Sequence, residues 1–281
     1  RDVAPSRGLG DVYKRQKPFH LNDAVMKITN FEALIDERTM KKKTMIVLMS
    51  AFLLLSAFSC GGGNKANSTS EQSEETAVNV PQFDADSAYL YVKNQVDFGP
   101  RVPNTKEHVA CGNYLAGQLE AFGAQVTNQY ADLIAYDGTL LKARNIIGSY
   151  KPESKKRIAL FAHWDTRPWA DNDPDEKNHN TPILGANDGA SGVGALLEIA
   201  RLVNQQQPEL GIDIILLDAE DYGAPQFYTG QHKEEFWCLG SQYWARNPHV
   251  QGYNARFGIL LDMVGGEGSA VSYTHLTLPT T

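Results

Sequence analysis

Hydrophobic residues follow helix-like and strand-like spacings in turn between residues 82 and 270. Apolar side chains recur on one helical face in residues 84–99 and 107–123, and each stretch ends at a glycine, which suits a helix C-terminus. Residues 123–136 and 143–150 alternate or cluster β-branched side chains, as strands do. The folded part is therefore predicted to begin with two helices and two strands.

Three further runs are almost entirely apolar and end in polar residues, which is typical of strands buried on both faces: 157–165, 212–220 and 256–266. Residues 189–206 have the spacing of a helix that connects the first two runs, and residues 240–247 predict a short helix. The pattern predicts an α/β fold, a three-layer sandwich with a mixed, partly parallel central sheet. Ligands are expected at the carboxyl ends of its strands.

The sequence outside this region has a different character. Met40 is followed by three lysines, an apolar stretch and Cys60, so residues 40–60 resemble a bacterial lipoprotein signal peptide. Residues 1–39 would then precede the start of the gene product, and residues 61–81 read as a flexible linker because they are rich in Gly, Ser, Asn and Glu. We expect export to the cell envelope and contact with the membrane only through a lipid on Cys60.

The opposite end also departs from the folded pattern. Residues 271–281 share no apolar periodicity with the preceding domain, and both ends of the chain resemble translated sequencing-adapter sequence. We therefore expect the domain at 82–270 to be incomplete, with the chain truncated at its C-terminus.

Charge limits the classes of partner. The 281 residues carry a formal net charge of -7, which argues against a nucleic-acid surface because such a surface needs Lys and Arg clustered on one face. Small molecules or peptides are the expected partners, and nucleic acid is not.

Acidic residues collect where the fold rule places a site. The candidate ligands follow the buried strands or precede the connecting helix: His163, Asp165, Asp188, Asp218, Glu220, Asp221 and Asp262. Carboxylates this close repel one another unless they are protonated or held by a cation. A His with Asp and Glu from separate strand ends suits a hydrolytic zinc site. Alternatively, Asp188 caps a helix, or the acids pair with Arg144, Arg167 or Arg256.

Seven segments occur in an order that resembles the zinc aminopeptidase family (peptidase family M28-type), which includes glutaminyl cyclases. They are FGPRVPNT, ARNIIGSY, FAHWDTRP, LGANDGASGVGALLEIARLV, LLDAEDYG, CLGSQYWA and LLDMVGG, and the likeness covers residues 90–268. HWDTRPWAD and DAEDYG are most similar to the bacterial glutaminyl cyclase-like branch.

The resemblance implies a role for each matching residue. Asp188 and Asp221 match zinc ligands, and Glu220 matches the general base. Asp262 matches a proton-network acid in cyclases and a second-zinc ligand in peptidases, where His163 matches the other ligand of that zinc. The last ligand of either type is a histidine beyond this sequence, and His275, in the suspected foreign tail, is not taken for it.

Two reactions use such a site, and the family resemblance favours cyclisation. Gly189 follows Asp188 where many two-zinc peptidases have Asn, and a long Trp-containing stretch separates Asp165 from Asp188. The expected activity is a one-zinc glutaminyl-peptide cyclotransferase that acts on peptides with a free N-terminus, N-terminal Gln favoured. A two-zinc aminopeptidase is the alternative, and a binding-only relative is less favoured because Glu220 is present.

Other residues have open or minor roles. Trp164, Trp169 and Trp237 either line an apolar pocket or pack in the core. Cys111 and Cys238 either pair or remain free thiols. Surface positions are expected for the loop histidines His179, His232 and His249.

Overall fold

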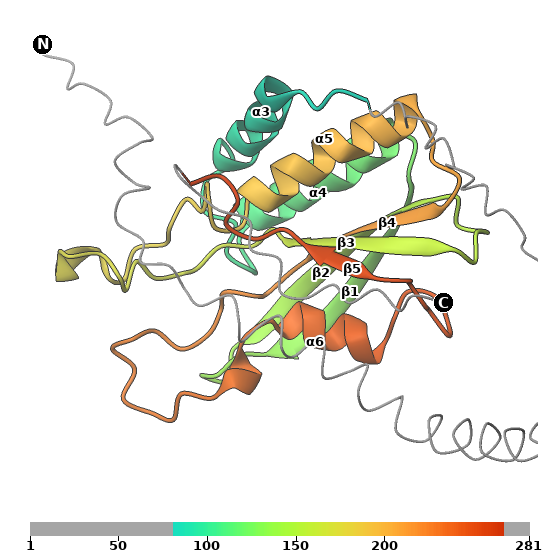
Figure 1. The fold of residues 1–281 in the computed structure, drawn as a ribbon. Coiled ribbons are helices and arrows are strands. Elements are labelled where there is room, and N and C mark those ends of the chain that lie inside the picture. Colours follow the sequence, from blue (N-terminus) through green and yellow to red (C-terminus); the bar gives the residue numbers. More distant parts are fainter. Residues whose placement is uncertain (1–80, 267–281) are drawn as a thin grey trace, which may run out of the picture. The chain divides into compact units, whose positions relative to one another are not determined.

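A five-stranded mixed sheet organises the part of the chain that the structure, a computed structural model, describes, which is residues 81–266. The strands lie in the order β1-β2-β4-β3-β5 (Figure 1). Pairs β1–β2 and β2–β4 are antiparallel, whereas β3 pairs in parallel with both β4 and β5. The bounds of the strands are β1 Gln125–Ile134, β2 Leu140–Tyr150, β3 Arg157–His163, β4 Gly211–Leu217 and β5 Gly258–Leu260.

Helices cover both faces of this sheet. Helices α3, α4 and α5 lie together on one face, and α6 lies on the other (Figure 1). Their bounds are α3 Ala85–Val96, α4 Lys106–Ala121, α5 Ser191–Gln205 and α6 Leu239–Arg246, with 3-10 turns at Glu176–Asn178 and Glu234–Phe236. The predicted three-layer α/β class with a partly parallel sheet is confirmed.

The helix starts follow ordinary capping chemistry. Asp84 accepts the backbone N–H groups of Asp86 and Ser87 at the start of α3, and the hydroxyl of Thr105 accepts that of His108 at the start of α4. Helix α5 begins after Ala190, which makes no side-chain cap. Asp188 is therefore not the N-cap of α5, which removes one alternative explanation for its position.

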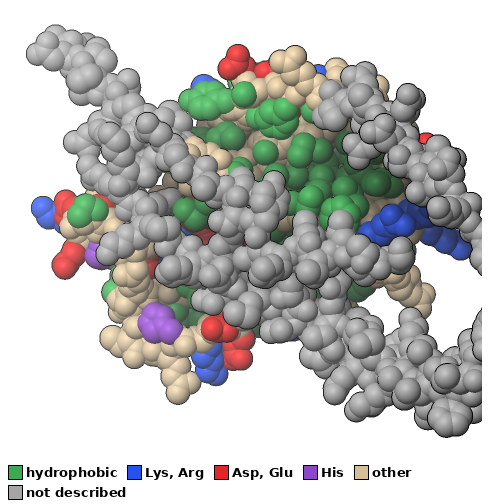
Figure 2. All heavy atoms as spheres, viewed as in Figure 1, with side chains coloured by type: hydrophobic (Ala, Val, Ile, Leu, Met, Phe, Trp, Pro, Cys, Tyr) green, Lys and Arg blue, Asp and Glu red, His purple; other side chains and the backbone are tan. Residues whose placement is uncertain are grey.

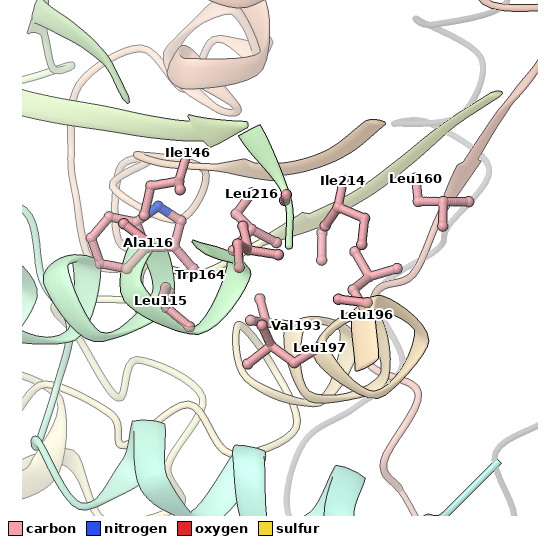
Figure 3. Close-up of a cluster of buried hydrophobic side chains, with 14 of the residues drawn as sticks. Leu115, Ala116, Ile146, Leu160, Trp164, Val193, Leu196, Leu197, Ile214 and Leu216 are labelled. Carbon is pink, nitrogen blue, oxygen red and sulfur yellow. The ribbon is translucent and has the colours of Figure 1, made fainter. Parts of the chain in front are cut away.

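The main core lies between the sheet and helices α4 and α5 (Figure 3). Leu115 from α4, Leu196 and Leu197 from α5, and Ile214 from β4 are all fully buried. Trp164 belongs to the same cluster, where its ring stacks on His108 with a centroid distance of 4.3 Å and its Nε1 donates to the carbonyl of Arg144. Trp164 is thus a core residue, and the suggestion that it lines an apolar pocket is wrong.

The third predicted buried strand is short and lies at an edge. Only Gly258–Leu260 forms β5, and Ile259 is 42% exposed because β5 pairs with β3 on one side alone among the described strands. Exposed apolar side chains also occur on α3, at Tyr89 and Leu90, and Figure 2 shows hydrophobic side chains gathered in the region of α3 and α5. Within residues 81–266, no helix has the length and apolar character to cross a membrane.

Several predictions concern residues outside this range. The upstream segment 1–39, the signal peptide 40–60 with Cys60, the linker up to residue 80 and the tail 271–281 all lie outside the described residues. They stay predictions.

Candidate metal centre

Five residues meet at the carboxyl ends of the parallel strands. His163 ends β3, Glu220 and Asp221 follow β4, Asp262 follows β5, and Asp188 precedes α5. Their ligand atoms form two groups that share His163, namely His163 with Asp188 and Asp221, and His163 with Glu220 and Asp262. Within each group these atoms lie within 4.8 Å of one another. The structure thus brings together all five residues that the family resemblance assigned to metal binding or catalysis.

Four potential ligand atoms of this cluster, from His163, Asp221 and Asp262, are buried without a hydrogen bond of good geometry. Nε2 of His163 lies 2.9 Å from Oδ1 of Asp188 and 3.4 Å from Oδ1 of Asp262. Neither ring nitrogen of His163 makes a hydrogen bond, and Oδ2 of Asp221 and Oδ1 of Asp262 make none either. Buried polar atoms normally have partners, so unpaired imidazole and carboxylate atoms that face one another fit the donor set of a divalent cation such as zinc.

The electrostatics of the cluster point the same way. Burial raises the pKa of Glu220 to about 7, with the charges of Asp262, Asp165 and Asp188 acting in the same direction. Burial and the charge of Asp188 raise the pKa of Asp221 well above its ordinary value. Burial disfavours the charged form of His163, but the surrounding carboxylates outweigh this effect and raise its pKa. The cluster therefore attracts positive charge.

Asp188 differs from the other acids. Burial alone would raise the pKa of Asp188, but its contact with His163 and the charge of that ring hold the pKa below its ordinary value. Among the described residues, none of the five forms an ion pair with an arginine: the ion pairs of Arg157, Arg167 and Arg201 are with Asp213, Asp171 and Glu198. Helix capping and arginine pairing thus fail to explain the acids, and a cation remains the better explanation.

Asp165 is not placed as a ligand, although the sequence offered it as one. Its Oδ1 accepts the backbone N–H of Glu220 at 3.0 Å, and its Oδ2 accepts that of Asp221 at 3.1 Å. The carboxylate thus holds the turn that presents both residues. Ala219, just before them, has a φ of 52°, a strained left-handed conformation that turns the chain out of the β4 alternation.

Asp218 lies outside the cluster as well. Its carboxylate contacts Nε2 of His108 at 2.9 Å and accepts the backbone N–H of Arg144. The side chain is fully buried, and its backbone N–H donates to Oδ1 of Asn145. The three acids of the DAED segment are therefore not held together by one cation: Glu220 and Asp221 face the cluster, whereas Asp218 pairs with His108 of α4.

A glycine allows Asp188 to approach β3. Gly189 has a φ of 98°, and a Cβ atom there would lie 2.4 Å from the carbonyl oxygen of Asp165. Only glycine combines this backbone conformation with so close an approach. In this chain the backbone conformation and the close approach at residue 189 therefore favour glycine on steric grounds.

Aromatic side chains lie beside the turn that carries Asp221. The guanidinium of Arg167 lies 5.7 Å from the ring of Trp169 and 4.8 Å from that of Trp237, and Trp169 also contacts Tyr136 and Tyr222 edge to face. The pattern of aromatic residues suggested their proximity to the site. It did not reveal the arginine between them.

The structure also locates the two cysteines and the three loop histidines. Cys111 and Cys238 are both free thiols. His232 is exposed and His179 is half-buried, but the side chain of His249 is 3% exposed and accepts the indole N–H of Trp244. The surface position predicted for His249 is wrong because the polar residues around it fold over a second core cluster that includes Trp244 and Tyr253.

Comparison with known proteins places the chain. Residues 145–280 match the model of Peptidase family M28, so this part of the chain is an M28 domain. The crystal structure of Bacteroides thetaiotaomicron glutaminyl cyclase bound to N-acetylhistamine is 94% identical, with a TM-score of 0.68, and the match covers 68% of this chain and 65% of that chain.

Two further relatives carry different names. A leucine aminopeptidase precursor from Bacteroides thetaiotaomicron VPI-5482 is also 94% identical, with a TM-score of 0.68 and coverage of 68% of this chain and 66% of that chain. The glutaminyl-peptide cyclotransferase of Drosophila melanogaster is 24% identical over 194 residues, which is 64% of this chain and 49% of that protein. The chain spans less than two thirds of the length of each of these three proteins.

Proposed function

We propose that the protein is a zinc-dependent glutaminyl-peptide cyclotransferase, which converts the N-terminal Gln of peptides to pyroglutamate with release of ammonia. The observation that carries the proposal is a carboxylate of general-base type, Glu220, that meets His163 in the same cluster as the candidate ligands Asp188 and Asp221, in a chain 94% identical to a solved glutaminyl cyclase. One base beside one Lewis acid is what the reaction needs.

The residues of the cluster would divide into ligands and proton carriers. Asp188 and Asp221 would hold one zinc ion, with a histidine beyond the described residues as the third protein ligand, since catalytic zinc usually has three. When bound, zinc supplies Lewis acid chemistry at the side-chain amide of the substrate. His163 and Asp262 would hold a second ion if the site takes two.

Glu220 would carry the proton. As the α-amine nitrogen forms a bond to the side-chain amide carbon, Glu220 takes a proton from that nitrogen. It returns the proton to the amide nitrogen as the carbon–nitrogen bond breaks, and ammonia leaves. Asp165 supports this step because it fixes the backbone N–H groups of Glu220 and Asp221 and so holds the base and a ligand in one geometry. Asp262 would accept and return protons beside Glu220.

An aminopeptidase is the second candidate. The proximity of His163 and Asp262, the candidate ligands of a second ion, is the observation that favours it, together with the leucine aminopeptidase precursor among the relatives. In that reaction Glu220 would deprotonate the water that attacks the first peptide bond and protonate the departing amine. The substrate class, peptides with a free N-terminus, is the same for both candidates.

The reaction products distinguish the two candidates. The full-length protein is incubated with peptides that differ only in beginning with Gln or Leu, and the products are followed by mass spectrometry and an ammonia assay. Loss of ammonia from the Gln peptide, with the Leu peptide intact, is the expected result. Release of free leucine without ammonia loss would favour the aminopeptidase instead.

The location of the protein is proposed from the sequence of residues 40–60. The lysines, apolar run and Cys60 support export and a lipid anchor in the bacterial cell envelope. Labelled palmitate should enter the wild-type protein and not Cys60→Ala. Equal labelling of the two would contradict the anchor.

A further inference from the structure

Arg167 uses all of its donor groups to join two segments near the metal centre. Nε donates to Oδ1 of Asp171 at 2.7 Å, and Nη2 donates to Oδ2 of the same residue at 2.5 Å. Nη1 donates to the carbonyl of Asp221 at 3.2 Å, with longer contacts from the guanidinium to the carbonyls of Gly223 and Ala224. The planar guanidinium thus connects the segment that follows β3 to the turn that follows β4.

Hydrogen bonds consequently hold the main chain of Asp221 on both sides of its α-carbon. Its N–H donates to Asp165 at 3.1 Å, and its C=O accepts from Arg167 at 3.2 Å. Both partners come from the same short segment, two residues apart. These two contacts fix the α-carbon of Asp221 and the direction of its Cα–Cβ bond, and so set the point from which its carboxylate reaches into the cluster, although residues 221–233 form no α-helix or strand.

Burial and further contacts hold the Arg167–Asp171 pair itself in place. The side chains of Arg167 and Asp171 are 11% and 1% exposed, and Oδ2 of Asp171 also accepts the backbone N–H of Gln226 at 2.8 Å. The ring of Trp237 lies over the guanidinium at 4.8 Å and packs against Gly223, where a Cβ atom would lie 2.2 Å from the ring. A buried, bidentate and stacked arginine is a geometry that lysine cannot reproduce.

We propose that Arg167, oriented by Asp171, is a positioning residue that sets the place of the Asp221 carboxylate relative to Asp188 and thereby the zinc affinity of the site. The proposal rests on the zinc binding of the proposed function. Arg167 does not touch the ligand atoms. It acts through the main chain of Asp221.

The test compares two arginines in the full-length protein. Arg167→Lys keeps the charge but removes the planar fork, and Asp171→Asn removes the charge that orients it. Arg157→Lys is the matched control, since Arg157 is also buried and bidentate to an aspartate but lies at the opposite end of β3, about 20 Å from His163 at 3.3 Å per strand residue. Zinc dissociation constants are measured by competition with a chromophoric chelator, cobalt spectra report the coordination, and urea unfolding reports stability.

Arg167→Lys is expected to weaken zinc binding about 10–100-fold, the usual effect of losing a residue that orients a ligand, and to alter the cobalt spectrum. Asp171→Asn should change both in the same direction. Arg157→Lys should lower stability and leave zinc affinity within about twofold of wild type.

Zinc affinity of Arg167→Lys within twofold of wild type would overturn the inference, as would equal weakening by Arg157→Lys, which would indicate a general effect of instability. A wild-type protein that binds no zinc would refute the proposed zinc chemistry together with this inference. Tight zinc binding by both wild type and Arg167→Lys would therefore refute the positioning role of Arg167 and leave the proposed zinc chemistry standing.

Discussion

A buried ion pair far from the metal centre gives a stability prediction that needs no assumption about function. Asp213, in the middle of β4, is fully buried and accepts hydrogen bonds from Nε and Nη2 of Arg157, at 2.5 and 2.7 Å. It also accepts from the hydroxyls of Ser149 and Tyr253, each at 2.7 Å. Four donors therefore converge on one carboxylate.

Asp213→Asn preserves the shape and removes the charge. The two hydroxyls can rotate, but the N–H groups of Arg157 are fixed, so at least one of them must face the new amide N–H₂ group. One hydrogen bond to a charged group, about 1.5–3 kcal/mol, is lost, and a buried guanidinium is left without a counter-charge. Breaking a buried pair at one partner costs about 3–5 kcal/mol in total, and we expect the free energy of unfolding to fall by that amount.

Urea unfolding at pH 7, followed by tryptophan fluorescence and circular dichroism, measures this change. Asp132→Asn is the matched control: it makes the same chemical change in an ion pair with Lys142 whose side chains are 59% and 64% exposed. Exposed pairs contribute about 0–1 kcal/mol, so this control should change stability little. A loss below about 1 kcal/mol for Asp213→Asn would refute the reasoning, because the convergent donors would then contribute nothing specific.

The Asp213–Arg157 pair also predicts how the stability difference between wild type and Asp213→Asn depends on pH. Burial raises the pKa of Asp213, but the hydrogen bonds from Arg157, Tyr253 and Ser149 outweigh it and hold the pKa below its ordinary value. A carboxyl group with a lowered folded-state pKa stabilises the fold above its unfolded pKa, about 3.9 for Asp, and this stabilisation is lost as the pH falls through the folded value. The gap between wild type and Asp213→Asn should therefore be constant above about pH 5 and narrow below about pH 4. A gap that widens in acid would contradict the assignment.

The remaining predictions concern the candidate site. Glu220→Gln should lower turnover at least ~100-fold with zinc retained, and full activity would remove Glu220 from the mechanism. Asp188→Ala should lose zinc as judged by metal analysis after gel filtration, and stoichiometric zinc would show that Asp188 is not a ligand. Gly189→Ala should lower stability by about 1–3 kcal/mol, because its φ is 98° and the new Cβ would lie 2.4 Å from the Asp165 carbonyl. In Gly117→Ala, within α4, the Cβ meets nothing within 4 Å and should stabilise by about 0.5–1 kcal/mol, so a loss there equal to that at Gly189 would contradict the steric explanation.

The hydrophobic pattern predicted most of the elements because helix and strand periods are local properties. The helix predicted within 84–99 is Ala85–Val96, and the connecting helix predicted within 189–206 is Ser191–Gln205. The apolar runs at 157–165 and 212–220 became the adjacent parallel strands β3 and β4. The pattern could not reveal that β2 lies between β1 and β4, nor that the run at 256–266 forms only the short strand β5, which pairs with β3 alone within the described part of the chain. Both depend on which strands pair, and pairing joins residues far apart in the chain.

The cluster itself was also accessible from the sequence. Polar residues that end buried parallel strands must meet at one edge of the sheet, so His163, Glu220, Asp221 and Asp262 could be named without a structure.

The tertiary structure alone decided how the neighbouring acids divide their roles. Asp218 and Glu220 are two residues apart, and strand alternation would place both on the same face. The left-handed conformation of Ala219 breaks that alternation, so that Asp218 meets His108 from α4 while Glu220 faces the cluster. The sequence likewise could not predict that Asp165 and Arg167 contact the main chain of the turn after β4. A local sequence pattern records the period of a strand, but the partner of a buried charge is chosen by packing between segments that the chain brings together only when it folds.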